Sequence, residues 1–367
     1  MSHLGRAPRV LVSGVVLDQP MGGVWRHNLE LLPRVAERLR SAGGELAILV
    51  GREGLSRELP GDLELIPGDV PPRPLLVRAS KEGRELDRVA RERGFDLVHV
   101  AHLPAPRNLD VPYTITLHDL RSLDLPHTPF SRRLFARTVI GRALRDARMV
   151  FTVSGWMVAR LASGWPEVSP KVLLVGNAGD HLEPTPVADE HRRRAGAPLL
   201  HLGHVERRKN LELLVRAIAE DPGLPDLLLA GREDPDEVTR LRQLAGELGV
   251  RERVSFHGPY AEQELPRLLA DCAAVVLPSH LEGFGIVALE ALAAGAPLAV
   301  STAGALTEVA GPQVPSFDPD DSAACARAIR LAMERGGEID TEGGGSWEAS
   351  ADAWSRGLAA ALEPGSR

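Results

Sequence analysis

The sequence has few of the residues that would place it in several large classes of protein. Only two of its 367 residues are cysteine, Cys272 and Cys325, so a disulfide framework or a cysteine zinc site is not expected. The net charge of −7 does not suggest non-specific nucleic-acid binding. No apolar run reaches the roughly 18 residues of a membrane-spanning helix. We therefore expect a soluble, cytoplasmic protein.

Lysine is also scarce, which makes each lysine informative. Of the 43 lysine and arginine residues, only Lys81, Lys171 and Lys209 are lysine, and the other 40 are arginine. A lysine between a strand and a helix, such as Lys209, is therefore a stronger candidate for a functional residue.

Short runs of Val, Ile and Leu alternate with longer segments of helical periodicity. In the first half of the chain the strand-like runs are Arg9–Leu17, Glu45–Val50, Asp96–His102, Tyr113–Asp119, Arg148–Ser154 and Lys171–Asn177. A polar, turn-rich linker, Asn177–Ala197, follows, and the alternation then resumes with PLLHLGH, DLLLAG, RVSFHG, AAVVLPS and PLAVS. Continuous apolar strands joined by helices predict parallel sheets covered on both faces.

The chain is too long for one typical core, and this pattern divides it into two α/β units. We predict a first domain over residues 1–178 and a second over residues 179–345. A glycine-rich break, Gly336–Gly345, precedes an amphipathic segment for which we predict a helix within residues 346–367. This helix could cross back to the first domain or pack only on its own domain. The sequence fits both alternatives equally well.

Ligands of open α/β sheets bind outside the carboxyl ends of the strands. In the first domain, Gly22 and Gly23 precede a helix, where glycine allows a phosphate to approach the backbone amides; a plain loop turn is the alternative. His118 ends a strand and can donate to a sugar hydroxyl or buffer a charge, although a structural histidine would look the same. With two such units, the default site is a cleft between them.

The second domain opens with GHVERRKN, where Gly203 ends a strand and Asn210 precedes a helix. Arg208 and Lys209 stand beside this helix N-terminus, where the macrodipole disfavours cations. Residues placed against a local structural preference are often functional, and a bound anion would offset the unfavourable interaction of these cations with the helix dipole. A solvated basic turn is the alternative.

The stretch LPSHLEGFGIVALEALAAGAPLAV contains two glutamates eight residues apart, Glu282 and Glu290. Gly283, Phe284 and Gly285 lie between a strand and a helix, so phosphates can approach the helix amides there. Carboxylates accept hydrogen bonds from sugar hydroxyls. We therefore predict that Glu282 reaches a sugar and Glu290 a ribose. An acidic residue near a helix N-terminus also interacts favourably with the helix dipole. That alternative would explain one glutamate, but not the two glycines.

Together these residues resemble the retaining GT-B glycosyltransferases of the group 1 class, glycosyltransferase family 4. EGFGIVALE resembles the family's E-x7-E segment, GHVERRKN its G-x-x-x-x-R-K-N element, TLHDL its His-Asp, and MGGVWRHNLELL its glycine-rich loop. His204 stands where many members carry arginine, which leaves open which basic residue contacts the diphosphate. NAGD replaces the usual NGVD.

The resemblance implies two Rossmann-like domains facing across a cleft, the first on the acceptor side and the second binding the nucleotide sugar. It implies transfer of a mannosyl-, glucosyl- or rhamnosyl-like group to a glycan, a lipid-linked sugar or a natural product, as in polysaccharide biosynthesis. The donor would be a GDP-, UDP-, ADP- or TDP-linked sugar, with no cofactor and no metal. The catalytic residues it implies are His118, Arg208, Lys209 and Glu282. The donor-binding residues it implies are Gly22, Gly23, Gly203, Gly283, Phe284, Gly285 and Glu290.

Other functions remain open on the sequence alone. A nucleotide-sugar 2-epimerase or a non-catalytic subunit that binds sugar nucleotides would carry much of the same pattern. A dehydrogenase is disfavoured because the dinucleotide fingerprint is missing. The segment Ser131–Arg148 has six arginines and one acid, which suits either peripheral contact with an anionic membrane at its inner face or a solvated helix face.

Overall fold

The computed structural model describes residues 7–18, 22–51, 62–71, 75–105, 109–125, 128–182, 196–337 and 345–363. Residues 183–195 of the predicted linker and residues 338–344 of the predicted break lie outside this part of the chain. The chain forms two compact units, residues 1–177 with 346–367, and residues 178–345. We describe each unit by itself.

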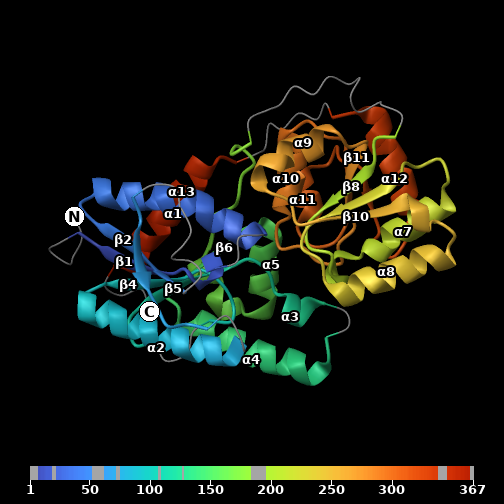
Figure 1. Cartoon of the computed structure of the whole chain (residues 1–367). Coiled ribbons are helices and arrows are strands. Elements are labelled where there is room, and N and C mark those ends of the chain that lie inside the picture. The colour runs from blue at the N-terminus through green and yellow to red at the C-terminus, as the bar shows by residue number, and fades with distance from the viewer. Residues whose placement is uncertain are drawn as a thin grey trace. The chain divides into compact units, whose positions relative to one another are not determined.

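The first unit contains a seven-stranded sheet in the order β3-β2-β1-β4-β5-β6-β7 (Figure 1). Its strands are β1 Arg9–Ser13, β2 Glu45–Val50, β3 Glu64–Pro67, β4 Leu97–Val100, β5 Tyr113–Leu117, β6 Met149–Thr152 and β7 Val172–Leu174. Neighbouring strands pair in parallel throughout. The strand order reverses between β1 and β4, which is where open sheets of this kind bind ligands.

Helices join the strands of this sheet. They are α1 Gly23–Ser41, α2 Leu75–Arg93, α3 Arg121–Asp124, α4 Phe130–Asp146 and α5 Gly155–Gly164; the unit also contains α13 Trp347–Ala361, which follows the second unit in the chain. Two caps follow the usual chemistry: the Ser154 hydroxyl accepts from the Met157 amide, and the Ser346 hydroxyl accepts from the Ala349 amide. Apolar residues of β1, β2, β4 and β5 are fully buried, as parallel strands between helices should be.

The second unit contains a six-stranded parallel sheet in the order β10-β9-β8-β11-β12-β13. Its strands are β8 Leu199–Leu202, β9 Leu227–Ala230, β10 Val254–Gly258, β11 Ala274–Leu277, β12 Leu298–Ser301 and β13 Ser316–Phe317. Its helices are α7 Leu211–Glu220, α8 Pro235–Glu247, α9 Leu265–Ala270, α10 Ile286–Ala293, α11 Leu306–Ala310 and α12 Ser322–Arg335. Strands β8 and β11 are neighbours, so the loops that follow them meet at one sheet edge.

The predicted parallel sheets are confirmed, but several predicted runs, among them Arg9–Leu17 and Lys171–Asn177, extend beyond their strands. The run Arg9–Leu17 does not continue as a strand, because β1 ends at Ser13 and Val15–Asp18 forms a 3-10 helix. A short apolar run reads the same in a buried strand and in a buried turn, so periodicity alone cannot separate them. The short edge strands β3 and β13 were also outside the prediction.

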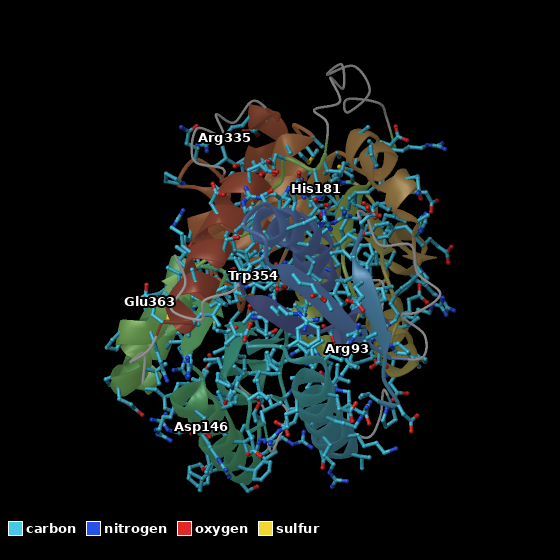
Figure 2. All side chains as sticks on the ribbon, turned by 90° about the vertical axis from the view of Figure 1, so that its left-hand side faces the viewer. Arg93, Asp146, His181, Arg335, Trp354 and Glu363 are labelled. Carbon is cyan, nitrogen blue, oxygen red and sulfur yellow. The ribbon has the colours of Figure 1, made fainter. Side chains whose placement is uncertain are left out.

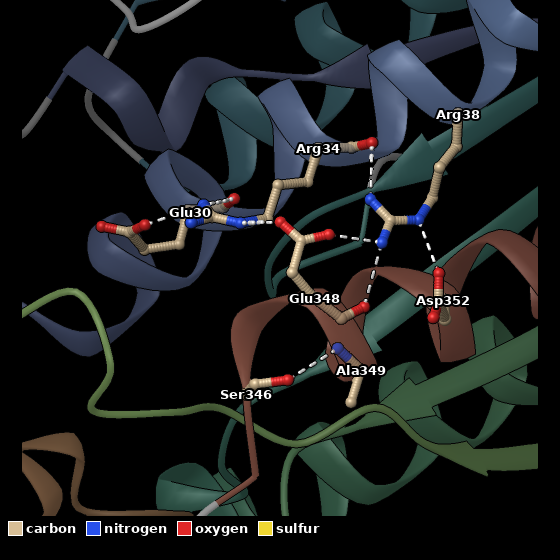
Figure 3. A network of polar contacts seen from close by, with 7 residues as sticks. All are labelled: Glu30, Arg34, Arg38, Ser346, Glu348, Ala349 and Asp352. Carbon is tan, nitrogen blue, oxygen red and sulfur yellow. Dashed lines mark hydrogen bonds and ion pairs between the residues drawn. The ribbon is translucent and has the colours of Figure 1, made fainter.

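Helix α13 packs on α1 and β6 of the first unit (Figure 1). Its two tryptophans, Trp347 and Trp354, are fully buried, and Figure 2 shows Trp354 inside this unit. At the surface, Arg34 and Arg38 of α1 bind Glu348 and Asp352 of α13 (Figure 3). Among the helices of the described residues, none combines the length and the apolar character needed to cross a membrane.

Candidate active site

Hydrogen bonds connect the loop after β8 to the loop after β11. Asn210 has a left-handed backbone, with φ of 54°, and its side-chain amide donates to the carbonyl oxygens of Pro278 at 3.1 Å and Pro319 at 2.7 Å. The backbone amide of His280 donates to the carbonyl of Arg208 at 3.1 Å. The basic turn Arg207–Lys209 therefore has a fixed place at the carboxyl end of the sheet.

Two cations of this turn bind the carboxylate of Glu282. Lys209 Nζ donates to Glu282 Oε1 at 2.7 Å, and an Arg208 guanidinium nitrogen donates to Glu282 Oε2 at 3.2 Å. The Ser279 hydroxyl also donates to Oε1 at 2.7 Å. Arg208 reaches the carbonyl of Leu281 as well, at 3.0 Å. The cations that the sequence suggests for an anionic ligand are thus held together by a carboxylate of the protein.

The electrostatics of this cluster favour the ionised form of Glu282. The side chains of Lys209, Arg208 and Glu282 keep 13–14% of their surface exposed. Burial opposes the charge on Glu282, but Lys209 and Arg208 outweigh it and hold the pKa of this carboxyl far below its usual value. An anionic ligand would therefore meet two cations that are already oriented and largely desolvated.

Backbone packing sets the position of Glu282. Gly304 has φ of +65°, and a Cβ there would lie 2.1 Å from the carbonyl oxygen of Glu282. The amide of Ala305 donates to that same carbonyl at 2.9 Å. Behind it, the Ser301 hydroxyl donates to the carbonyl of Ser279 at 2.7 Å. The segment after β12 thus supports the loop that carries Glu282.

Gly285 is the N-cap of α10, with φ of 90° and no side-chain capping contact. Gly283 is buried and Phe284 half-buried in the loop just before it. A helix N-terminus presents backbone N–H groups that suit phosphate oxygens. Gly203 lies across the site after β8, where a Cβ would stand 3.5 Å from Lys209 Nζ.

Glu290 lies in the second turn of α10 and has a different environment from Glu282. Its side chain is only 6% exposed, and its Oε1 lies 3.3 Å from His181 Nε2. The two glutamates of the E-x7-E segment therefore have separate partners, two cations in one case and an imidazole in the other.

Two histidines flank the cationic pair. Burial, together with the charge of Lys209, lowers the pKa of His201 to about 3. Burial also lowers the pKa of His204 to about 4. Both imidazoles are neutral near pH 7, so His204 adds no positive charge where the resemblance places an arginine in many members.

In the first unit, Gly22 is the N-cap of α1 with φ of 108°, and Gly23 is the first residue of that helix. His118 follows β5, and its ring packs edge-on against His27 of α1, with centroids 4.7 Å apart. His118 Nε2 lies 3.2 Å from the carbonyl of Ala101, and burial lowers its pKa well below 6.5. Because a carbonyl only accepts, Nε2 carries the proton and Nδ1 of the neutral ring is an acceptor. His118 would therefore accept from a sugar hydroxyl, rather than donate to it as expected from the sequence.

Several residues of these sites escaped the sequence analysis. They are His181 beside Glu290, His27 beside His118, and Ser279 and Gly304 around Glu282. His181 directly follows the NAGD element, and that adjacency was the one signal for it. His27 and Gly304 depend on contacts between segments far apart in the chain, whereas Ser279 lies only three residues before Glu282.

Two protein-family models match the chain. The model described as "Glycosyl transferases group 1" matches residues 190–341, and the model described as "Glycosyltransferase Family 4" matches residues 21–181. The first match falls in the second unit, and the second falls mainly in the first unit.

Curated relatives agree with these models. D-inositol 3-phosphate glycosyltransferase of Salinispora arenicola is 30% identical over 75% of this chain, but the match spans only 64% of that protein's length. The same-named protein of Thermobispora bispora is 29% identical over 95% of this chain and 93% of its own. O-antigen chain mannosyltransferase B of Escherichia coli is 26% identical over 89% of this chain and 91% of its own.

Solved structures share the fold. Sucrose-phosphate synthase from Thermosynechococcus elongatus matches with a TM-score of 0.72 and 22% identity, over 97% of this chain and 94% of that chain. Anabaena HepE in complex with UDP and glucose matches with a TM-score of 0.63 and 20% identity, over 95% of both chains. At these identities the likeness concerns the fold.

Proposed function

Since the chain belongs to the group 1 glycosyltransferases, glycosyltransferase family 4, we propose that it transfers a hexosyl group from a nucleotide-diphosphate sugar to an acceptor hydroxyl. Membership of this family and the GT-B fold, both expected from the sequence, are confirmed. The proposed group is mannosyl-, glucosyl- or rhamnosyl-like, and its anomeric configuration is retained. The acceptor is a glycan, a lipid-linked sugar or a small molecule.

The cluster of Arg208, Lys209 and Glu282 carries this proposal. Glu282 holds two cations side by side at the carboxyl end of β8, so their position does not depend on the ligand. A departing nucleoside diphosphate gains negative charge in the transition state. Oriented cations stabilise that charge without further reorganisation, and one such donor is worth about 2.7–4 kcal/mol of the barrier.

In the proposed reaction, the bond between the anomeric carbon and the diphosphate oxygen breaks, and the electron pair stays on the diphosphate. The acceptor oxygen forms its bond to the same face of the anomeric carbon. The acceptor's proton passes to the departing phosphate oxygen, so the step needs no carboxylate pair at glycosidase spacing. Lys209 and Arg208 supply the positive charge, and the proposal therefore includes no metal ion.

The remaining predicted residues have further roles in the proposal. We assign the diphosphate to the amides at the start of α10, beside Gly283, Phe284 and Gly285. We assign the ribose to Glu290. We assign Gly22 and Gly23 of the first unit to donor binding, and His118 to catalysis.

Only the chemical class of the donor substrate is proposed. HepE is described in complex with UDP and glucose, and relatives are named for inositol phosphate and mannosyl transfer. These names support a nucleotide-sugar donor and leave GDP, UDP, ADP and TDP as candidate nucleotides. Calorimetric titration of the full chain with each of the four, followed by donor hydrolysis without acceptor, distinguishes them.

A lysine variant tests the proposed function directly. We expect Lys209→Ala to lower donor turnover about 10²–10³-fold, because it removes one cation from the leaving group. Lys81→Ala is the matched control, since Lys81 is a half-exposed lysine of the first unit. Binding of none of the four nucleotides by the wild type, or unchanged turnover in Lys209→Ala, would contradict the proposal.

We also propose that α4 brings the protein to an anionic membrane surface. Three of its side chains are unusually exposed for their size: Phe130 at 80%, Leu134 at 55% and Phe135 at 54%. The same helix carries exposed arginines, namely Arg132, Arg137, Arg142 and Arg145, of which Arg142 and Arg145 are paired with Asp146 and Glu167. Aromatic side chains can enter the headgroup region while arginines contact anionic lipid. This contact would suit a lipid-linked acceptor at the cytoplasmic face.

Vesicle sedimentation tests this contact. We expect binding to vesicles of phosphatidylcholine with phosphatidylglycerol, weaker binding to phosphatidylcholine alone, and loss at high salt. The double variant Phe130→Ser with Phe135→Ser should lose binding. Leu331→Ser, an exposed apolar residue of α12, is the control. Equal binding of the double variant and the wild type would overturn the membrane proposal.

A further inference from the structure

We infer that His181 is a positioning residue for Glu290, an assignment that rests on the proposed ribose role of that glutamate. His181 Nε2 lies 3.3 Å from Glu290 Oε1, and both side chains are within the protein, 5% and 6% exposed. His181 is labelled in Figure 2. The contact joins the segment that directly follows the NAGD element to α10, the helix that contains the second glutamate of the E-x7-E segment.

The surroundings of Glu290 explain why its carboxylate needs a partner. Its neighbours on α10, Ala288, Ala291 and Leu292, are buried apolar residues. A buried carboxylate without a hydrogen-bond donor is costly. An imidazole N–H at Oε1 meets part of this need.

A glycine brings the two segments together. A Cβ on Gly179 would lie 3.0 Å from the carbonyl oxygen of Leu289 and 3.2 Å from its Cβ. This close approach sets the backbone two residues before His181 directly against the residue before Glu290. The histidine is therefore placed by backbone packing as well as by its own side-chain contact.

The contact has a chemical consequence for ligand binding. With Oε1 engaged by His181, the orientation of the carboxylate plane is defined, and Oε2 is the atom that accepts from a ribose hydroxyl. Without the imidazole the carboxylate turns about its terminal bond, and the ribose must order it on binding. That ordering lowers affinity for nucleotides that carry the hydroxyls, but not for nucleotides that lack them.

The experiment measures the value of the ribose hydroxyls. UDP, GDP, ADP and TDP are titrated into the full chain, and the tightest binder is compared with its 2′,3′-dideoxy form. The ratio of the two dissociation constants is the hydroxyl dependence. For the wild type we expect about tenfold to hundredfold, the range of hydrogen bonds to a charged group.

Variants then separate the inference from its premise. We expect Glu290→Gln and His181→Ala each to reduce the hydroxyl dependence at least about fivefold, and the double variant to fall no further than Glu290→Gln, since coupled residues are not additive. His181→Gln, which keeps a side-chain N–H, should restore most of the dependence. His257→Ala, at an exposed histidine of β10, is the control.

The outcomes are distinguishable. If Glu290→Gln leaves the hydroxyl dependence unchanged, the ribose role itself fails, and with it the inference. If Glu290→Gln abolishes the dependence while His181→Ala preserves it, the ribose role stands and the inference is overturned. His181→Ala could also lower the affinity for the nucleotide and for its dideoxy form equally and lower the melting temperature of the protein. In that case His181 is structural, and the inference is again overturned. Gly179→Ala, which moves the histidine without replacing it, gives the same readout should His181→Ala not fold.

Discussion

Glu282 is held both through its side chain and through its backbone. Lys209, Arg208 and Ser279 donate to the carboxylate, while the amide of Ala305 donates to the carbonyl. Gly304, the residue before Ala305, packs against this same backbone. The cations are oriented through Glu282, so a displacement of its loop should change the proposed diphosphate site, although we assign no ligand contact to Gly304.

Gly304→Ala tests this dependence. Its Cβ would overlap the carbonyl oxygen of Glu282 at 2.1 Å, so the loop must move. Gly311→Ala is the matched control, because it has a similar positive φ of +85° but its Cβ meets nothing within 4 Å. We expect both variants to lose stability, and Gly304→Ala alone to lose about 10²-fold in kcat/KM, since small misplacements of reacting groups have such effects. Equal kcat/KM values for the two variants would contradict this prediction.

At the scale of elements, α13 completes the first unit from the far end of the chain. Trp354 packs edge-on against His99, with ring centroids 4.6 Å apart, and lies 6.2 Å from Phe151. Arg38 binds Glu348 at 2.6 Å and Asp352 at 2.7 Å on the outer side (Figure 3). Glu348 and Asp352 are more than half exposed, so these ion pairs are well solvated. We therefore assign the stabilisation to the buried rings.

Two variants compare the two kinds of contact. Trp354→Ala should lower the free energy of unfolding by ~3–5 kcal/mol, the range for large aromatic residues removed from a core. Arg38→Ala should lower it by ~1 kcal/mol or less, because exposed ion pairs contribute little. Urea unfolding followed by circular dichroism measures both. A larger loss for Arg38→Ala than for Trp354→Ala would show that the ion pairs, rather than the core, hold the helix.

At the scale of the whole molecule, both units contain buried neutral histidines. In the first unit, burial lowers the pKa of His27 to about 4, although its hydrogen bond to Asn177 opposes the shift. Burial also holds the pKa of His99 well below its usual value. In the second unit, burial together with the charge of Lys209 lowers the pKa of His201 to about 3. Folding therefore keeps these imidazoles from binding protons that the unfolded chain would bind.

Stability should fall in mild acid as a result. Between pH 6.5 and 4 the unfolded chain binds protons at these histidines and the folded chain does not, so each lowers the unfolding free energy by up to about 1.4 kcal/mol per pH unit. Carboxylates begin to protonate only nearer their own usual pKa, so the interval from pH 6.5 to 5 reports on histidine. We expect urea midpoints to fall across that interval, and His27→Gln to fall less steeply. Constant midpoints from pH 7 to 5 would contradict this account.

The sequence by itself determined the two parallel sheets and the position of the candidate residues at strand ends. Both follow from local information: a run such as Val10–Val12 is apolar throughout because both faces of its strand are covered. The order of strands then brings the loops after β8 and β11 to one edge. A lysine and an arginine placed against a helix dipole could likewise be recognised from neighbouring residues alone.

The tertiary structure alone decided which side chains are partners. Lys209 meets Glu282 across 73 residues, His181 meets Glu290 across 109, and Arg38 meets Glu348 across 310. The first of these contacts also depends on close backbone packing, such as the approach of Gly304 to Glu282. Periodicity encodes the face on which a side chain lies, but not the distance to a distant loop, because that distance is set by the packing of all the elements between them.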